Sequence, residues 1–291
     1  MASTADFDAQ VERAMQAGYR AHMRPVIEKE LLHYDILFAM DQAGLLDRLT
    51  FQGGTALRLC YGSQRFSDDL DFVGGSDFAA AQLQDIKSCI VDHVGKRYGL
   101  EVRIKEPKEL AQDPESRHIN VHKWQISVIT APTRRDLPRQ MIKVEVAGVP
   151  AYTRLPQALQ NDYDFLPDGY SDLVILVESL DEILADKLVS LVACTAYVRH
   201  RDIWDLHWLQ QQGAKIDPVL VRNKIRDYGV TDYPTLSAQL INRLPGIIRG
   251  KEFRDQMSRF IPMDVQERTL LKNKFLELLA QETALALKRA A

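Results

Sequence analysis

Residues 52–72 read QGGTALRLCYGSQRFSDDLDF, and this stretch decides the fold assignment. A short apolar run ends at Gln52, the pair Gly53 and Gly54 opens a stretch with a helical pattern, and acidic residues crowd the start of a strand. Carboxylates are poor strand formers and repel one another. The stretch therefore predicts a site where something compensates for that repulsion.

Asp69 and Asp71 are two residues apart, so on a strand their side chains leave the same face, with α-carbons roughly 6 to 7 Å apart. Two carboxylates about 5 Å apart cost on the order of 3 kcal/mol at an effective dielectric constant of about 20. A divalent cation reverses the sign of that energy, and magnesium prefers one or two carboxylates plus substrate phosphates. We interpret Asp69 and Asp71 as candidate metal ligands, whereas Asp68 points to the other face or lies in the preceding loop.

The glycine pair predicts a second element of the same site. A strand, a double glycine and a helix present backbone N–H groups to an anion, and glycine lets a phosphate approach the backbone. A glycine pair alone usually marks only a turn. Beside the paired aspartates it favours a phosphate site, and the absence of a GxxxxGK[ST] sequence excludes a P-loop.

Glu145 is the candidate for a third carboxylate. It alternates with valines in KVEVAG, so it belongs to a strand and either faces solvent or joins the site. In two-metal sites shared carboxylates hold ions roughly 3.5 to 4 Å apart, and Glu145 would then hold the ion that activates the attacking oxygen.

Two charged positions stand out in the helical second half. Ser179 and Glu182 have the spacing of a capping box, and Lys187 then lies within the apolar stripe of the helix that begins there. An inward lysine needs an anion, either a protein carboxylate or a ligand phosphate, unless it snorkels to solvent. In RHRDIWDLHWL, Asp202 falls on the apolar side of a helix and Asp205 at its border. Asp202 could alternatively cap the helix dipole.

The organisation of the chain follows from its periodicity. Helical spacing up to about Leu49 precedes a region of strands, a helix is expected from about Asp77 to Lys96, and helical spacing returns after about Pro167. The expected strands are LTFQ, LDFV, EVRIKE, KWQISVIT and MIKVEVAG. We therefore expect an α/β core with N-terminal helices in residues 1–166 and a helical region in residues 167–291.

Composition limits the class of protein. The 291 residues are 46% hydrophobic and 26% charged, as in a soluble globular protein. The N-terminal stretch lacks a signal-peptide pattern and no apolar run is long enough to span a bilayer, so we expect a cytoplasmic protein without a membrane partner. Three widely spaced cysteines indicate reduced thiols.

The net charge of -3 argues against bulk attraction to nucleic acid but leaves room for a local basic cluster. The basic residues of the stretch 132–143 are Arg134, Arg135, Arg139 and Lys143. They form either an RNA contact or a solvated loop. Arg249, Lys251 and Arg254 are a second candidate cluster.

The motifs GGTALRLCYGSQRFSDDLDF, KVEVAG, LDEILADKLVSLV and RHRDIWDLHWL, in this order, resemble those of the AbiEii/AbiGii-type nucleotidyltransferase toxins, which include the MenT toxins. The resemblance covers roughly residues 51–209. The sequence departs from the family pattern at Thr55, where the family often has serine, and at Glu145, where it often has aspartate. Both replacements keep the hydroxyl or the carboxylate.

The resemblance implies a DNA polymerase β-like nucleotidyltransferase fold, an α/β core with a mixed sheet. Magnesium or manganese would be held by Asp69, Asp71 and Glu145, and the nucleoside triphosphate (NTP) by Lys187, while Asp202 and Asp205 complete the pocket from the helical region. The further nucleotide-binding residues that it implies are Gly53, Gly54, Thr55, Arg58, Arg65 and Ser67.

It also implies a toxin of an abortive-infection or toxin-antitoxin system, neutralised by a cognate antitoxin. Such a toxin transfers a nucleotide from an NTP to the 3′ end of an RNA, the acceptor end of tRNA above all. Two alternatives remain at the level of the sequence. The acceptor could be a small molecule or a protein hydroxyl, or the chain could be a nucleotide- or RNA-binding module without turnover.

Overall fold

The computed structural model describes residues 6–16, 18–107, 119–132 and 138–291. These residues form two compact units. The first, called the sheet unit, comprises the described residues up to 107 and Asn120–Val177. The second, called the helical unit, consists of Glu178–Ala291 together with Ile119. The sequence-based division at 166/167 thus falls before the last strand of the sheet unit.

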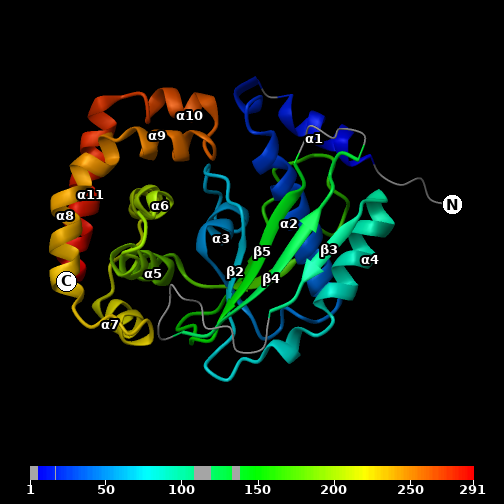
Figure 1. Cartoon of the computed structure of the whole chain (residues 1–291), viewed down its shortest axis with the longest axis horizontal. Helices are drawn as coiled ribbons and strands as arrows, with labels where there is room; N and C mark the ends of the chain where they lie inside the picture. Colours follow the sequence, from blue (N-terminus) through cyan, green and yellow to red (C-terminus); the bar gives the residue numbers. More distant parts are fainter. Residues whose placement is uncertain (1–5, 17, 108–118, 133–137) are drawn as a thin grey trace. The chain divides into compact units, whose positions relative to one another are not determined.

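A mixed seven-stranded sheet lies at the centre of the sheet unit, in the order β3-β4-β5-β2-β1-β7-β6. Figure 1 labels strands β2 to β5 of this sheet. The strands are β1 (Thr50–Gln52), β2 (Leu70–Val73), β3 (Val102–Lys105), β4 (Val121–Val128), β5 (Gln140–Ala147), β6 (Leu155–Ala158) and β7 (Val174–Val177). Strand β2 runs parallel to β5, and β1 runs parallel to β7, whereas the other neighbours are antiparallel. The predicted α/β fold class is confirmed.

The five segments expected to be strands correspond to β1 to β5, whereas β6 and β7 were not expected. The prediction of helical structure after about Pro167 was wrong for β7, whose sequence VILV is a short apolar run. Such a run is ambiguous between a buried strand and a helix segment when only its periodicity is known.

Alternation along the strands gives β3, β4 and β5 two different faces. The covered face carries apolar side chains such as Trp124, Ile126, Val144 and Val146, and helices α2 (Arg24–Gln42) and α4 (Ile86–Tyr98) pack against the sheet. The open face carries polar side chains, which are half-buried or exposed. The side chains of a strand alternate between the two faces, and all the lysine, arginine and glutamate side chains of these three strands fall on the open face.

The other helices of the sheet unit are α1 (Phe7–Met15) and α3 (Gly53–Leu59), with 3₁₀ turns at Gly18–Arg20 and Ala80–Leu83. The helix expected from Asp77 to Lys96 begins only at Ile86, so its first part was placed wrongly. The ring of Phe78 packs against Gly74, where a Cβ would lie 2.5 Å from it, and this contact holds Phe78 in a loop conformation.

Helices α5 to α11 make up the helical unit. They are α5 (Leu180–Ala193), α6 (His200–Gln211), α7 (Pro218–Asp227), α8 (Tyr233–Arg249), α9 (Lys251–Ser258), α10 (Met263–Arg268) and α11 (Asn273–Ala290). The Ser179 side chain accepts a hydrogen bond from the Glu182 N–H, which confirms the expected N-cap of α5.

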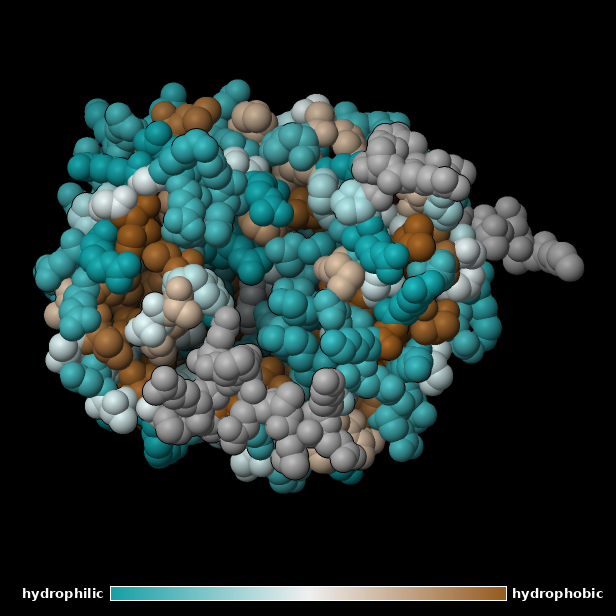
Figure 2. All heavy atoms as spheres, viewed as in Figure 1, coloured by the Kyte–Doolittle hydropathy of each residue, from teal (hydrophilic) through white to brown (hydrophobic). Residues whose placement is uncertain are grey.

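Hydrophilic side chains cover most of the face seen in Figure 2, and hydrophobic ones gather in smaller patches. Among the described helices, none combines the length and the hydropathy that a membrane span requires.

Candidate functional site

The sequence-predicted site residues divide between the two units, so each set is described by itself. The sheet unit carries the paired aspartates, Glu145, the glycine pair and the residues from Thr55 to Ser67. The helical unit carries Lys187, Asp202 and Asp205. Arg139 is exposed just before β5, whereas Arg134 and Arg135 lie outside the described residues.

Two predicted metal ligands are neighbours on the open face of the sheet. Asp71 on β2 is in register with Glu145 on the adjacent parallel strand β5. Asp69 lies just before β2, and its Oδ1 accepts a hydrogen bond from the Lys143 N–H at 2.9 Å. Parallel pairing of β2 with β5 therefore brings together carboxylates that are more than 70 residues apart in sequence.

Two lysines lie beside these carboxylates, Lys123, which was not predicted as a site residue, and Lys143, which was named only as part of the basic stretch 132–143. The Lys123 Nζ is 3.1 Å from the Glu145 Oε1, and the Lys143 Nζ is 3.8 Å from the Asp69 Oδ2 and 3.9 Å from the Glu145 Oε1. Lys143 shares a face with Glu145 because it is two residues away, a signal present in the sequence. Lys123 joins them only through the register of β4 with β5.

The glycine pair makes room for side chains of this site. Gly53 has a φ of 75°, and a Cβ there would lie 2.7 Å from the Asp71 Oδ2. A Cβ on Gly54 would lie 2.3 Å from the Arg65 Nη2 and 3.0 Å from the Ser67 Oγ. The Thr55 hydroxyl donates to the Asp69 carbonyl oxygen. These contacts hold the paired aspartates against the start of α3.

Both arginines predicted to bind nucleotide are buried in the sheet unit. Arg58 donates to both Glu30 carboxylate oxygens at 2.8 and 3.0 Å, forms an ion pair with Asp162, and stacks over Phe66. Burial opposes the charge of Arg58, but Glu30 outweighs burial and raises the pKa of the guanidinium. The Arg65 Nη1 donates to the Phe66 carbonyl. Nucleotide contact by these arginines stays a prediction, and their contacts favour a structural role.

In the helical unit Lys187 is only 6% exposed and meets two carboxylates. Its Nζ is 2.9 Å from the Asp202 Oδ1 and 2.7 Å from the Asp205 Oδ2. Ser190 and Arg199 also donate to Asp202. Burial favours the neutral acid, but Arg199 and Lys187 outweigh it and hold the pKa of Asp202 far below its usual range. The sequence predicted either a protein carboxylate or a ligand phosphate as the partner of Lys187, and in the structure its partners are the carboxylates of Asp202 and Asp205.

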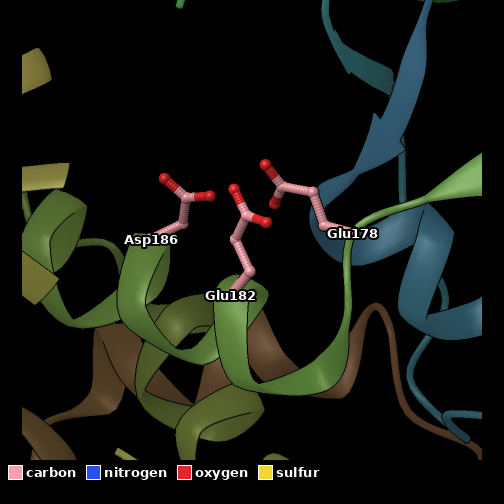
Figure 3. Close-up of side chains that lie close together, drawn as sticks. All are labelled: Glu178, Glu182 and Asp186. Atoms are coloured by element: carbon pink, nitrogen blue, oxygen red, sulfur yellow. The ribbon is translucent and has the colours of Figure 1, made fainter. Parts of the chain in front are cut away.

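A second carboxylate cluster in the helical unit was not foreseen. Glu178, Glu182 and Asp186 point toward one another at the start of α5, with oxygens within 4.8 Å of each other (Figure 3). The Lys224 Nζ from α7 lies 3.0, 2.7 and 2.9 Å from these three groups, respectively. Burial and the neighbouring Asp186 raise the pKa of Glu178 well above its usual range. Lys224 therefore offsets part of the negative charge of the three carboxylates.

The two carboxylate clusters differ in how they fit a metal ion. In the Lys224 cluster the lysine ammonium group already contacts all three acids, so this cluster does not fit a metal ion. Among the described residues the Lys224 cluster is nevertheless the one trio of such side chains whose ligand oxygens all lie within 4.8 Å of one another. The oxygens of Asp69, Asp71 and Glu145 do not all come that close together. Asp69, Asp71 and Glu145 offer oxygen ligands on an open face, where Lys123 pairs with Glu145 at 3.1 Å and Lys143 lies 3.8 to 3.9 Å from Asp69 and Glu145, and no single lysine that the structure describes contacts all three acids. That chemistry fits magnesium or manganese.

Residues 35–281 match the profile of the family described as nucleotidyl transferase AbiEii toxin, type IV TA system. The chain belongs to this family. The expected resemblance is confirmed, and the protein is a nucleotidyltransferase of a toxin-antitoxin family.

One solved structure shows a similar fold, and a second gives a weaker match. MenT4, a nucleotidyltransferase toxin from Mycobacterium tuberculosis, has a TM-score of 0.54 at 20% identity, covering 97% of this chain and 98% of that chain. The JHP933 protein from Helicobacter pylori has a TM-score of 0.42 at 21% identity over 91% of each chain. Among curated proteins, none matches the sequence.

The first prediction for this nucleotidyltransferase concerns Gly53. We expect Gly53→Ala to lower the free energy of unfolding by about 1 to 2 kcal/mol through its positive φ. It should also reduce nucleotidyl transfer on the order of 100-fold, because the new Cβ displaces the Asp71 carboxylate. Gly99→Ala is the matched control, with a φ of 69° and nothing within 4 Å of the added Cβ. Urea unfolding should show a similar loss of the free energy of unfolding in both variants. Equal transfer rates of Gly53→Ala and Gly99→Ala would contradict the role of Gly53.

The second prediction concerns Lys187. Lys187→Met removes the charge that balances two buried carboxylates, so the free energy of unfolding should fall by about 3 to 5 kcal/mol. Lys251→Met is the control, since Lys251 is 91% exposed and its pair with Asp255 contributes little. Unchanged stability with a loss of NTP affinity by calorimetry would show instead that Lys187 is held for phosphate.

The third prediction concerns the Lys224 cluster. A raised folded-state pKa means that Glu178 stabilises the fold below its usual pKa near 4.5 and loses that contribution as pH rises through the folded value. Glu178→Gln mimics the protonated acid, so its stability relative to wild type should increase with pH in urea unfolding. Lys224→Met should be destabilised by about 3 to 5 kcal/mol. A stability difference independent of pH, or a wild-type protein destabilised by a chelator, would refute this account.

Proposed function

We propose that this nucleotidyltransferase transfers a nucleotide from an NTP to the 3′-hydroxyl of an RNA, with the acceptor end of tRNA as the preferred target. The observation that carries the proposal is the placement of Asp71 beside Glu145 on adjacent strands, with Asp69 fixed by the Lys143 N–H. Family membership supports the reaction class.

Asp69, Asp71 and Glu145 would hold magnesium or manganese on the open face. The ion, when bound, neutralises phosphate charge and activates the attacking oxygen. Until then Lys123 and Lys143 offset the repulsion between the acids. In the reaction the 3′-hydroxyl loses its proton to water and its oxygen forms a bond to the α-phosphorus. The bond between the α-phosphorus and the oxygen that bridges it to the β-phosphate breaks, and pyrophosphate leaves with that electron pair.

The glycine turn has a role that the observed contacts support. Gly53 and Gly54 leave space for the carboxylate of Asp71 and for the Arg65 guanidinium, so the turn orients the acid set. Thr55 and Ser67 lie beside this turn. We keep Lys187 as the proposed triphosphate-binding residue, and Asp202 and Asp205 as proposed catalytic residues. Blocking tRNA ends would stop protein synthesis, which suits a cytoplasmic toxin that a cognate antitoxin must control.

The test uses purified protein with magnesium, the four NTPs and total tRNA, followed by sequencing of RNA 3′ ends. We expect wild type to add nucleotides and Asp71→Asn to lose at least about 100-fold, since even the loss of a group that only orients a metal ligand costs 10- to 100-fold. Asp68→Asn is the matched control, because Asp68 pairs with Lys29 on α2. It should retain transfer. Nucleotide transfer only to protein or small molecules, with unmodified RNA ends, would overturn the RNA assignment. Full activity of Asp71→Asn would overturn the assignment of Asp71 to the catalytic site.

A further inference from the structure

The open face of β3, β4 and β5 carries more positive charge than the chain as a whole. Its basic side chains are Arg103, Lys105, Lys123 and Lys143, and we call this set the basic strip. The same strands contribute one acid, Glu145, so their net charge is three positive (four minus one) in a chain of net charge -3. The covered face of these strands carries no acidic or basic side chain apart from His122, whose pKa is lowered by burial.

The strip leads away from the carboxylates to the edge of the sheet. Lys143 is beside Asp69, Gln125 is in register with Lys143, and Lys105 is in register with Gln125. Strand β3 lies two strand spacings, about 10 Å, from β5. A stacked nucleic acid strand rises about 3.4 Å per nucleotide, so this distance corresponds to about three nucleotides.

The outer cations of the strip are accessible. Arg103 is exposed, and its pair with the exposed Glu101 is of the kind that contributes little. Lys105 is also exposed and has no ion-pair partner among the residues that the structure describes. Both can therefore exchange their present surroundings for phosphate at small cost.

We propose that the basic strip binds the backbone of the acceptor RNA and leads its 3′ end to the carboxylates. This inference rests on the proposed function. The open face of the three strands has Gln125, Ser127 and Met141 between its charges and no aromatic ring, so it offers phosphate contacts without a stacking platform. Binding is accordingly independent of base sequence and strongly dependent on salt.

The test measures binding of a short fluorescein-labelled single-stranded RNA with a free 3′-hydroxyl, by anisotropy at several salt concentrations without NTP. The variant Arg103→Gln with Lys105→Gln leaves the lysines that touch the carboxylates unchanged. The matched control is Lys87→Gln with Lys96→Gln, which removes two exposed cations from α4, the helix that packs against β3. NTP affinity, measured by calorimetry, should be unchanged in both.

We expect the strip variant to lose about 1.4 units of log-log salt slope, at about 0.7 per phosphate contact, and roughly 25-fold in affinity at 0.1 M salt. Each single variant should lose about half the slope, and the control none. Equal RNA binding by wild type and strip variant, or no RNA binding by wild type, would overturn the inference, and an acidic protein partner would then suit the strip better. Strip-dependent RNA binding without nucleotide transfer would confirm that the strip binds RNA, but it would remove the proposed function and with it the delivery of a 3′ end to the carboxylates.

Discussion

Repulsion between carboxylates on adjacent strands is the constraint around which the sheet unit is organised. Asp71 and Glu145 are side by side in the β2–β5 pair, and like charges about 5 Å apart cost on the order of 3 kcal/mol at an effective dielectric constant of about 20. Lys123 and Lys143 offset this cost on the open face. Gly53 allows the Asp71 carboxylate to lie against the backbone, which a side chain at that position would prevent.

The helical unit uses a different solution for buried charge. Lys187 on α5 lies between two buried carboxylates of α6, and Lys224 on α7 lies among three buried carboxylates, two of which belong to α5. A buried ion pair contributes little net free energy to folding, because burying the two charges costs nearly as much as their attraction returns. Removal of one partner is strongly destabilising, because the other charge is then buried without a counter-charge. The rotation of α5 is thereby fixed from two sides. Lys187 thus has a defined position whether its physiological anion is Asp202 or a phosphate.

Local signals in the sequence predicted much of this structure. Alternation located β1 to β5, the Ser179 cap located α5, and the apolar stripe identified Lys187 as an inward charge. Features that depend on register or on distant partners were missed. Lys123 reaches Glu145 only because β4 pairs with β5, and Lys224 comes from a helix that no spacing rule connects to Glu178. The family resemblance placed Arg58 among the nucleotide-binding residues, and its buried partner Glu30, 28 residues upstream on α2, was not foreseen.

The central claim is that the open-face carboxylates, and not the Lys224 cluster, hold the divalent ion. The most direct measurement is electron paramagnetic resonance of Mn²⁺ binding in the presence of a non-hydrolysable NTP, comparing wild type with Glu145→Gln and Glu182→Gln. The account predicts that Glu145→Gln loses bound Mn²⁺ whereas Glu182→Gln retains it. Retention by Glu145→Gln together with loss in Glu182→Gln would place the ion at the start of α5 and contradict the account.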